Sequence, residues 1–158
     1  MWLTLETRQE KCYNTAKTRR EKCKVERIAY KSLINWKNSP QRKPLILRGA
    51  RQVGKTWLLK EFGRREYTSF VYINCDKEPF AADLFRDYDI RRILLALEAN
   101  TGVHVREKET LVVFDEIQEA PRGIGALKYF CEDAPGIHVA AAGSLLGMAG
   151  LALKRKRA

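Results

Sequence analysis

Residues 49–56 read GARQVGKT and match the pattern G-x-x-x-x-G-K-[ST]. An apolar run, Leu45-Ile46-Leu47, comes directly before them, and Leu58 and Phe62 follow at helical spacing. Glycines let the backbone curl so that successive N–H groups point at one anion, and the positive end of the following helix faces the same point. The pattern therefore predicts a strand, a phosphate-binding loop and a helix in succession.

Each residue of this loop is a candidate ligand for a nucleotide. Lys55 is expected to reach the β- and γ-phosphates, and the Thr56 hydroxyl is expected to bind Mg²⁺. The other predicted cofactor-binding residues are Gly49, Ala50, Arg51, Gln52, Val53 and Gly54. The alternative is an ordinary glycine turn before a helix, which would bind nothing.

Two carboxylates follow a second apolar run. Leu111–Phe114 reads LVVF and is followed by Asp115 and Glu116. An Asp at the tip of a strand is suited to hold Mg²⁺, directly or through water. The next carboxylate points elsewhere, so Glu116 is the candidate base for a water molecule beyond the γ-phosphate. By itself such a pair is more often a solvated strand end.

The apolar pattern predicts alternating strands and helices. Near-continuous apolar runs predict strands at 45–47, 70–73, 111–114 and 137–142. Helical spacing lies between and around them, at 25–36, 57–62, 90–97 and 127–130. Gly63 is expected to end one helix, and Asp89 and Gly102 are expected to cap another. This alternation is typical of a parallel α/β sheet.

The positive charge of the chain is confined to its two ends. The 158 residues carry a formal net charge of +11, of which residues 1–44 contribute +8 and residues 154–157 contribute +4. We therefore divide the chain into a basic N-terminal extension (1–27), a core (28–150) and a basic tail (151–158). Basic flanks bind nucleic-acid phosphates through counterion release, or they are simply solvated tails, and both interpretations stay open.

Several other classes of protein are disfavoured. The four cysteines show no metal-binding spacing and no sign of a disulfide scaffold. The most apolar segment, 137–153, is short for a membrane span and is interrupted by glycines, so it is interpreted as a strand and a loop. No apolar leader follows Met1. We expect a cytoplasmic protein without a membrane segment.

Taken together, these residues resemble the AAA+ branch of P-loop ATPases. The resemblance is closer to a bacterial and archaeal group of AAA-domain proteins that usually carry a C-terminal nuclease-like domain of unknown function. It covers about residues 28–147. The matching stretches are 36–44, 45–56 (LILRGARQVGKT), 71–76 (VYINCD), 113–119 (VFDEIQE), 127–130 and 142–146.

The resemblance implies a three-layer P-loop NTPase fold with ATP and Mg²⁺ as cofactors. It also adds two candidate residues to Lys55 and Glu116. Ser144 matches the polar sensor at the tip of the strand beside the phosphate loop, although it could instead cap the next turn. Asn74 falls at a strand end where such proteins often carry a polar residue that restrains the catalytic glutamate.

The chain also departs from this family. The family continues with a fifth strand, a helical lid and the further domain, whereas this chain reads as truncated after the strand that ends at Ser144. In the strand order 5-1-4-3-2 of the family, the missing strand would leave residues 45–47 as an exposed edge. We therefore expect an incomplete sheet of about four strands without a lid, completed by a partner or a second copy. No arginine finger can be assigned.

The function that these observations favour is Mg²⁺-dependent ATP hydrolysis by an AAA+ core, weak or inactive alone because the lid and the arginine finger are missing. Two alternatives stay open. One is a fragment that binds nucleotide without hydrolysing it. The other is a nucleic-acid-binding protein that acts through its basic N-terminal flank. The adjacent acids suit attack by water better than transfer to a small-molecule acceptor.

Overall fold

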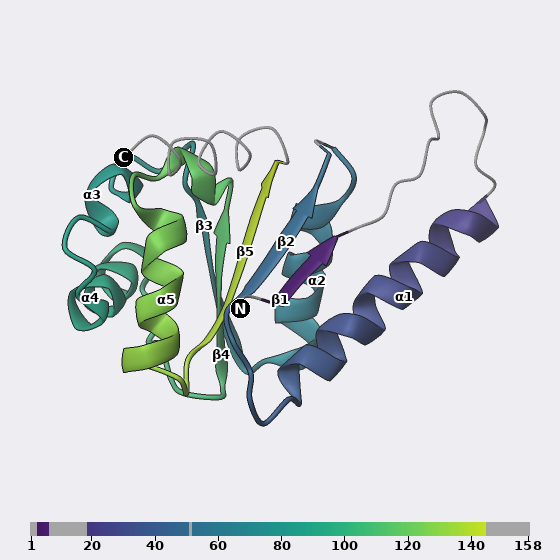
Figure 1. Cartoon of the computed structure of the whole chain (residues 1–158), viewed down its shortest axis with the longest axis horizontal. Helices are drawn as coiled ribbons and strands as arrows, with labels where there is room; N and C mark the ends of the chain where they lie inside the picture. The colour runs from purple at the N-terminus through teal and green to yellow at the C-terminus, as the bar shows by residue number, and fades with distance from the viewer. Residues whose placement is uncertain (1–2, 7–18, 51, 145–158) are drawn as a thin grey trace, which may run out of the picture.

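The computed structural model describes residues 3–6, 19–50 and 52–144, with side chains from residue 28 onward. Its centre is a five-stranded parallel sheet in the order β1-β2-β5-β4-β3 (Figure 1). The strands are β1 (Leu3–Glu6), β2 (Leu45–Gly49), β3 (Ser69–Asn74), β4 (Thr110–Asp115) and β5 (His138–Ser144). The predicted fold class and all four predicted strands are confirmed.

Helices cover both faces of the sheet and make three layers (Figure 1). One face carries α1 (Arg19–Lys37) and α2 (Lys55–Glu66). The other carries α3 (Ala81–Leu84), α4 (Ile90–Thr101) and α5 (Gly123–Asp133), and a single 3₁₀ turn, η1 (Ile117–Glu119), follows β4. Because helices cover both faces of a parallel sheet, each face of this sheet buries its own apolar cluster.

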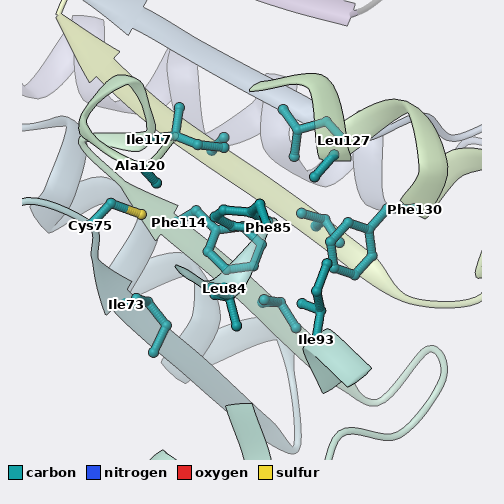
Figure 2. Packing of buried hydrophobic residues seen from close by; sticks show 14 of the residues in the cluster. Ile73, Cys75, Leu84, Phe85, Ile93, Phe114, Ile117, Ala120, Leu127 and Phe130 are labelled. Atoms are coloured by element: carbon teal, nitrogen blue, oxygen red, sulfur yellow. The ribbon is translucent and has the colours of Figure 1, made fainter. Parts of the chain in front are cut away.

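The larger apolar cluster lies between the sheet and α3, α4 and α5, and Figure 2 shows part of it. The ring of Phe114, from the centre of the sheet, meets Phe85 edge to face at 5.1 Å and Phe130 at 6.0 Å between centroids. All three side chains are fully buried. This packing holds β4 rigidly against the helices, and β4 carries the two candidate carboxylates at its end.

The edge of the sheet beside β2 is occupied, which corrects the expectation of a four-stranded sheet with an exposed edge. Strand β1 pairs with β2 in parallel, from Leu3 opposite Leu45 to Glu6 opposite Arg48. The backbone of β2 is thereby bonded on both sides, to β1 and to β5. The fifth strand comes from the N-terminal end of the chain, where the sequence shows no long apolar run.

Two helix bounds also differ from the prediction. Helix α1 begins at Arg19, before residue 25, and α2 continues past Gly63 to Glu66. Gly63 lies within the helix and close to β3, where a Cβ atom would lie 3.0 Å from the Phe70 side chain. The caps of α4 are confirmed, since Asp89 accepts a hydrogen bond from the Arg92 N–H and Gly102 has φ of 70°.

Several predictions about the two ends of the chain are not tested by the structure. The boundaries at residues 27 and 150 are not tested, and the basic tail, the expected absence of a lid and the end of the 142–146 match lie outside the described residues. So do the side chains of residues 1–27, the larger part of the basic flank (1–44) to which the nucleic-acid hypothesis refers. No helix of the described part is both long and apolar enough to cross a membrane.

Candidate functional site

The predicted site residues meet at the carboxyl ends of the strands. Gly49 ends β2 and lies opposite Ser144, the last residue of β5. Asn74 ends β3 and lies opposite Asp115, the last residue of β4. Because all strands run in parallel, these four ends share one edge of the sheet, where open α/β sheets bind their ligands.

The phosphate loop joins β2 to α2 with the helix aimed at that edge. Gly54 precedes the helix with φ of 88°, a left-handed conformation that glycine adopts without steric cost. Gln52, also left-handed, is exposed, Val53 is half-buried, and Arg51 lies outside the described residues. The loop therefore leads into the N-terminus of α2, and its shape depends on left-handed residues.

Lys55 lies inside this loop. Its Nζ donates hydrogen bonds to the carbonyl oxygens of Gly49 at 3.0 Å and Ala50 at 2.6 Å. Burial lowers the pKa of Lys55, while the nearby charges of Glu116 and Asp115 oppose that shift. The ammonium is thus held at the loop, within the field of both predicted acidic residues.

Thr56 and Asp115, the two predicted metal ligands, are in direct contact. The Thr56 hydroxyl donates to Asp115 Oδ2 at 2.6 Å. The same oxygen accepts a second hydrogen bond from the Tyr72 hydroxyl at 2.8 Å, and Oδ1 accepts one from the Glu116 N–H at 3.1 Å. The carboxylate is buried and held by three donors. The sequence analysis did not predict a role for Tyr72. The feature that could have indicated one is a tyrosine on the strand next to the strand that ends in Asp115.

Glu116 begins the turn after β4 in a left-handed conformation, with φ of 50° and ψ of 43°. Its carboxylate accepts a hydrogen bond from the Gln118 side-chain amide. Asn74, the residue expected to restrain it, is used differently: its Oδ1 accepts from the N–H groups of Asp76 and Lys77. Among the described residues, the side chain that donates to the Glu116 carboxylate is that of Gln118, and no hydrogen bond joins Asn74 to Glu116.

Ser144 lies where the sensor residue was predicted, at the tip of β5 next to the first glycine of the loop. It is buried. Neither its predicted contact with a γ-phosphate nor the alternative turn cap is tested by this placement.

An open cleft of about 540 Å³ lies between the phosphate loop and the ends of β3 and β4. Its walls are formed by Gln52, Thr56, Asn74, Asp76, Lys77, Glu116 and Glu119. The cleft offers a hydroxyl and several carboxylates, which are hard oxygen ligands of the kind that Mg²⁺ prefers, with water completing its coordination. The residues present therefore fit a magnesium ion beside Thr56 and Asp115.

Comparison with protein families agrees with this geometry. The AAA domain family matches residues 41–155, which is more than half of the chain and includes the loop, the acidic pair and Ser144. The chain belongs to the AAA domain family. Its fold and phosphate loop are those of a P-loop ATPase family that binds nucleotide, and the predicted family is confirmed at this level.

Other comparisons add little beyond the family. The structure of the Aeropyrum pernix ORC2 protein, described as ADPNP–ADP complexes, is similar to this AAA domain with a TM-score of 0.42 and 20% sequence identity. The alignment covers 90% of this chain and 46% of that one, so the chain spans less than half the length of this structural relative. No curated protein matches this chain.

Proposed function

We propose that this AAA domain binds Mg²⁺–ATP in the cleft and hydrolyses the terminal phosphate with Glu116 as general base. The observation that carries the proposal is the 2.6 Å hydrogen bond between Thr56 Oγ1 and Asp115 Oδ2. It brings the first turn of α2 and the end of β4 together, although the two residues are 59 positions apart in the sequence. A solvated acidic strand end, the simpler interpretation of the acidic pair, would not need this contact.

The loop and Lys55 would bind the triphosphate. The backbone N–H groups at the start of α2 are without helical partners and carry the positive end of the helix dipole, so they attract phosphate oxygens. The Lys55 ammonium now bonds two loop carbonyls, and a phosphate oxygen is a stronger, charged acceptor for the same donor. Thr56 and Asp115 would hold the Mg²⁺, which neutralises charge on the phosphates when it is bound.

Glu116 is the group best suited to activate water. Its carboxylate faces the cleft and is close enough to Lys55 to act on its pKa. In the proposed reaction, water oxygen bonds to the γ-phosphorus as the bond to the bridging oxygen breaks. The water proton passes to Glu116, and ADP and inorganic phosphate are the products. Ser144 would contact the γ-phosphate or the attacking water from the adjacent strand.

Turnover by this chain alone is expected to be slow. In related NTPases an arginine finger supplied by a second protein or subunit raises turnover by about 10³-fold or more. A second copy or another protein would supply this group. We therefore expect this chain to bind nucleotide by itself and to need a partner for fast hydrolysis.

Binding and turnover should be measured separately with ATP and GTP in the presence of Mg²⁺. Lys55→Ala should weaken ATP binding by about 10–100-fold, since it removes a charged hydrogen-bond donor, and Lys31→Ala, an exposed lysine on α1, is the control. Glu116→Gln should retain binding and lose about 100-fold or more in turnover. Equal binding by Lys55→Ala would contradict the site, and binding without turnover would favour a non-hydrolysing nucleotide-binding module.

A further inference from the structure

We propose that Gln118 is the positioning residue for Glu116, and that its side-chain amide holds the Glu116 carboxylate toward the phosphate loop. This inference rests on the proposed hydrolysis by Glu116. It assigns a role to the DEIQ run at residues 115–118 that neither the loop nor the metal ligands explain. Gln118 acts on the reaction through Glu116 and needs no contact of its own with the nucleotide.

The contact between the two side chains is direct. Gln118 Nε2 donates to Glu116 Oε2 and lies 3.4 Å from Glu119 Oε1. One amide nitrogen thus faces two carboxylates. Reversing the amide would place its carbonyl oxygen against both of them, so the chemistry of the site selects a single orientation.

The amide oxygen supports the same interpretation. Gln118 Oε1 is buried and accepts no hydrogen bond from the described residues. A buried oxygen without a donor is unfavourable, and the side chain would be expected to turn it toward water unless another contact held it. The contact available is the one from Nε2 to Glu116. The orientation of Gln118 is therefore determined by the glutamate that it contacts.

The backbone of Glu116 and Gln118 is held in place by a buried neighbour and by the hydrogen bonds of the turn. Ile117, between them, is fully buried and packs in the cluster with Phe114 and Ala120 (Figure 2). The turn is closed by two backbone hydrogen bonds, from the Glu119 N–H to the Glu116 oxygen at 2.9 Å and from the Ala120 N–H to the Ile117 oxygen at 3.2 Å. These contacts hold Glu116 in its left-handed conformation, which a non-glycine residue adopts only when its surroundings require it.

No other described side chain donates to the Glu116 carboxylate in this arrangement. The Asn74 Oδ1 atom accepts from the N–H groups of Asp76 and Lys77, and no hydrogen bond joins Asn74 to Glu116. Lys55 acts on Glu116 by charge but bonds the loop carbonyls. Without Gln118, the Glu116 side chain would be free to leave the cleft for water. A proton acceptor must be held within hydrogen-bond reach of the attacking water, so its loss of position should lower turnover.

Gln118→Met keeps the length of the side chain and removes both amide groups. We expect kcat for ATP to fall by about 10–100-fold, the range seen when an orienting partner is removed, while KM and ATP affinity stay within about twofold. Gln118→Glu is the second variant, since it stays polar but has no N–H donor, and it should lose turnover in the same way. Gln41→Met makes the same substitution at an exposed site at the other end of the sheet, and it should behave as the wild type.

A double-mutant cycle distinguishes positioning from a general structural effect. In a Glu116→Gln background, Gln118→Met should cause no further loss of turnover, because the group that it positions is gone. An additional 10-fold loss there, or unchanged turnover of Gln118→Met in a chain whose wild type hydrolyses ATP, would overturn this inference alone. No hydrolysis by the wild-type chain would overturn the proposed function and this inference with it.

Discussion

Tyr72 donates its hydroxyl to Asp115 Oδ2 at 2.8 Å, and this is the oxygen that also accepts the hydrogen bond from Thr56. Lys60 lies over the Tyr72 ring, with its Nζ 3.7 Å from the ring centroid. Burial and the adjacent Asp115 carboxylate raise the pKa of Tyr72, so its hydroxyl stays protonated as a donor at neutral pH. The predicted metal carboxylate is therefore oriented by a residue on the neighbouring strand.

Tyr72→Phe should destabilise the protein and weaken its use of Mg²⁺. Removing a donor from a buried carboxylate should lower the free energy of unfolding by about 2 kcal/mol. The Mg²⁺ concentration for half-maximal ATP binding should rise, because Asp115 loses one of the contacts that orient it. Urea denaturation and a Mg²⁺ titration of ATP binding measure the two effects.

The control for this variant is a second tyrosine–carboxylate pair. Tyr30 donates its hydroxyl to Glu66 Oε1 at 2.8 Å, between α1 and α2. Tyr30→Phe removes the same kind of contact, and it should lower stability without changing the Mg²⁺ requirement. Equal Mg²⁺ requirements for Tyr72→Phe and Tyr30→Phe would show that Tyr72 has only a structural role.

His138 should make stability fall as the pH is lowered from about 6.5 to about 4. Burial, followed by the charges of Arg42, Lys37 and Lys108, lowers the pKa of His138 to about 4. Its Nδ1 shares a hydrogen bond of 2.6 Å with the Tyr67 hydroxyl. In this window the unfolded chain binds a proton that the folded protein excludes. Integrated over the window, the loss is on the order of 3 kcal/mol, and it is absent above pH 7.

Two histidine variants isolate this effect from the titration of carboxylates. His138→Gln should remove much of the slope of unfolding free energy against pH between 5 and 7, measured by urea denaturation at each pH. His104→Gln makes the same substitution at an exposed histidine and controls for the substitution itself. A wild-type protein with flat stability over this range would contradict the burial of a neutral His138.

The parts of the site that could be predicted from the sequence are those that local pattern determines. The G-x-x-x-x-G-K-[ST] pattern, between an apolar run and helical spacing, predicts the places of Lys55 and Thr56. Apolar runs of three residues or more indicated β2, β3, β4 and β5. Because those strands are parallel, the ends carrying Asp115 and Ser144 had to meet the loop.

The parts that could not be predicted depend on contacts between distant segments. Strand β1 is four residues long and has no continuous apolar run, and only its pairing with β2 makes it a strand. The choice between Asn74 and Gln118 depends on the left-handed turn at Glu116, which residue spacing does not reveal. Side-chain hydrogen bonds of this kind follow from backbone direction, and the backbone direction follows from packing.

The pairing of β1 can be tested with proline. In an edge strand, alternate N–H groups point at the neighbouring strand or away from it, so only one of two adjacent positions loses a ladder hydrogen bond to proline. Thr4→Pro and Leu5→Pro should therefore differ, with one lowering the free energy of unfolding by about 1–2 kcal/mol and the other by less. Thr4→Ala and Leu5→Ala control for loss of the side chains. Four variants of equal stability would contradict the docking of β1 on β2.

Gly54 and Gly102 form a matched pair that separates backbone strain from ligand binding. Both have positive φ, of 88° and 70°, and a Cβ atom would meet nothing within 4 Å at either position. Alanine at each should therefore cost about 1–2 kcal/mol of stability through strain alone. Gly54 lies in the phosphate loop and Gly102 caps α4 on the other face of the sheet, so only Gly54→Ala should also weaken ATP binding, by about 10-fold or more. Calorimetric binding and urea denaturation of both variants test this. Equal ATP affinity in the two variants would mean that the curl at residues 49–56 does not hold the phosphates.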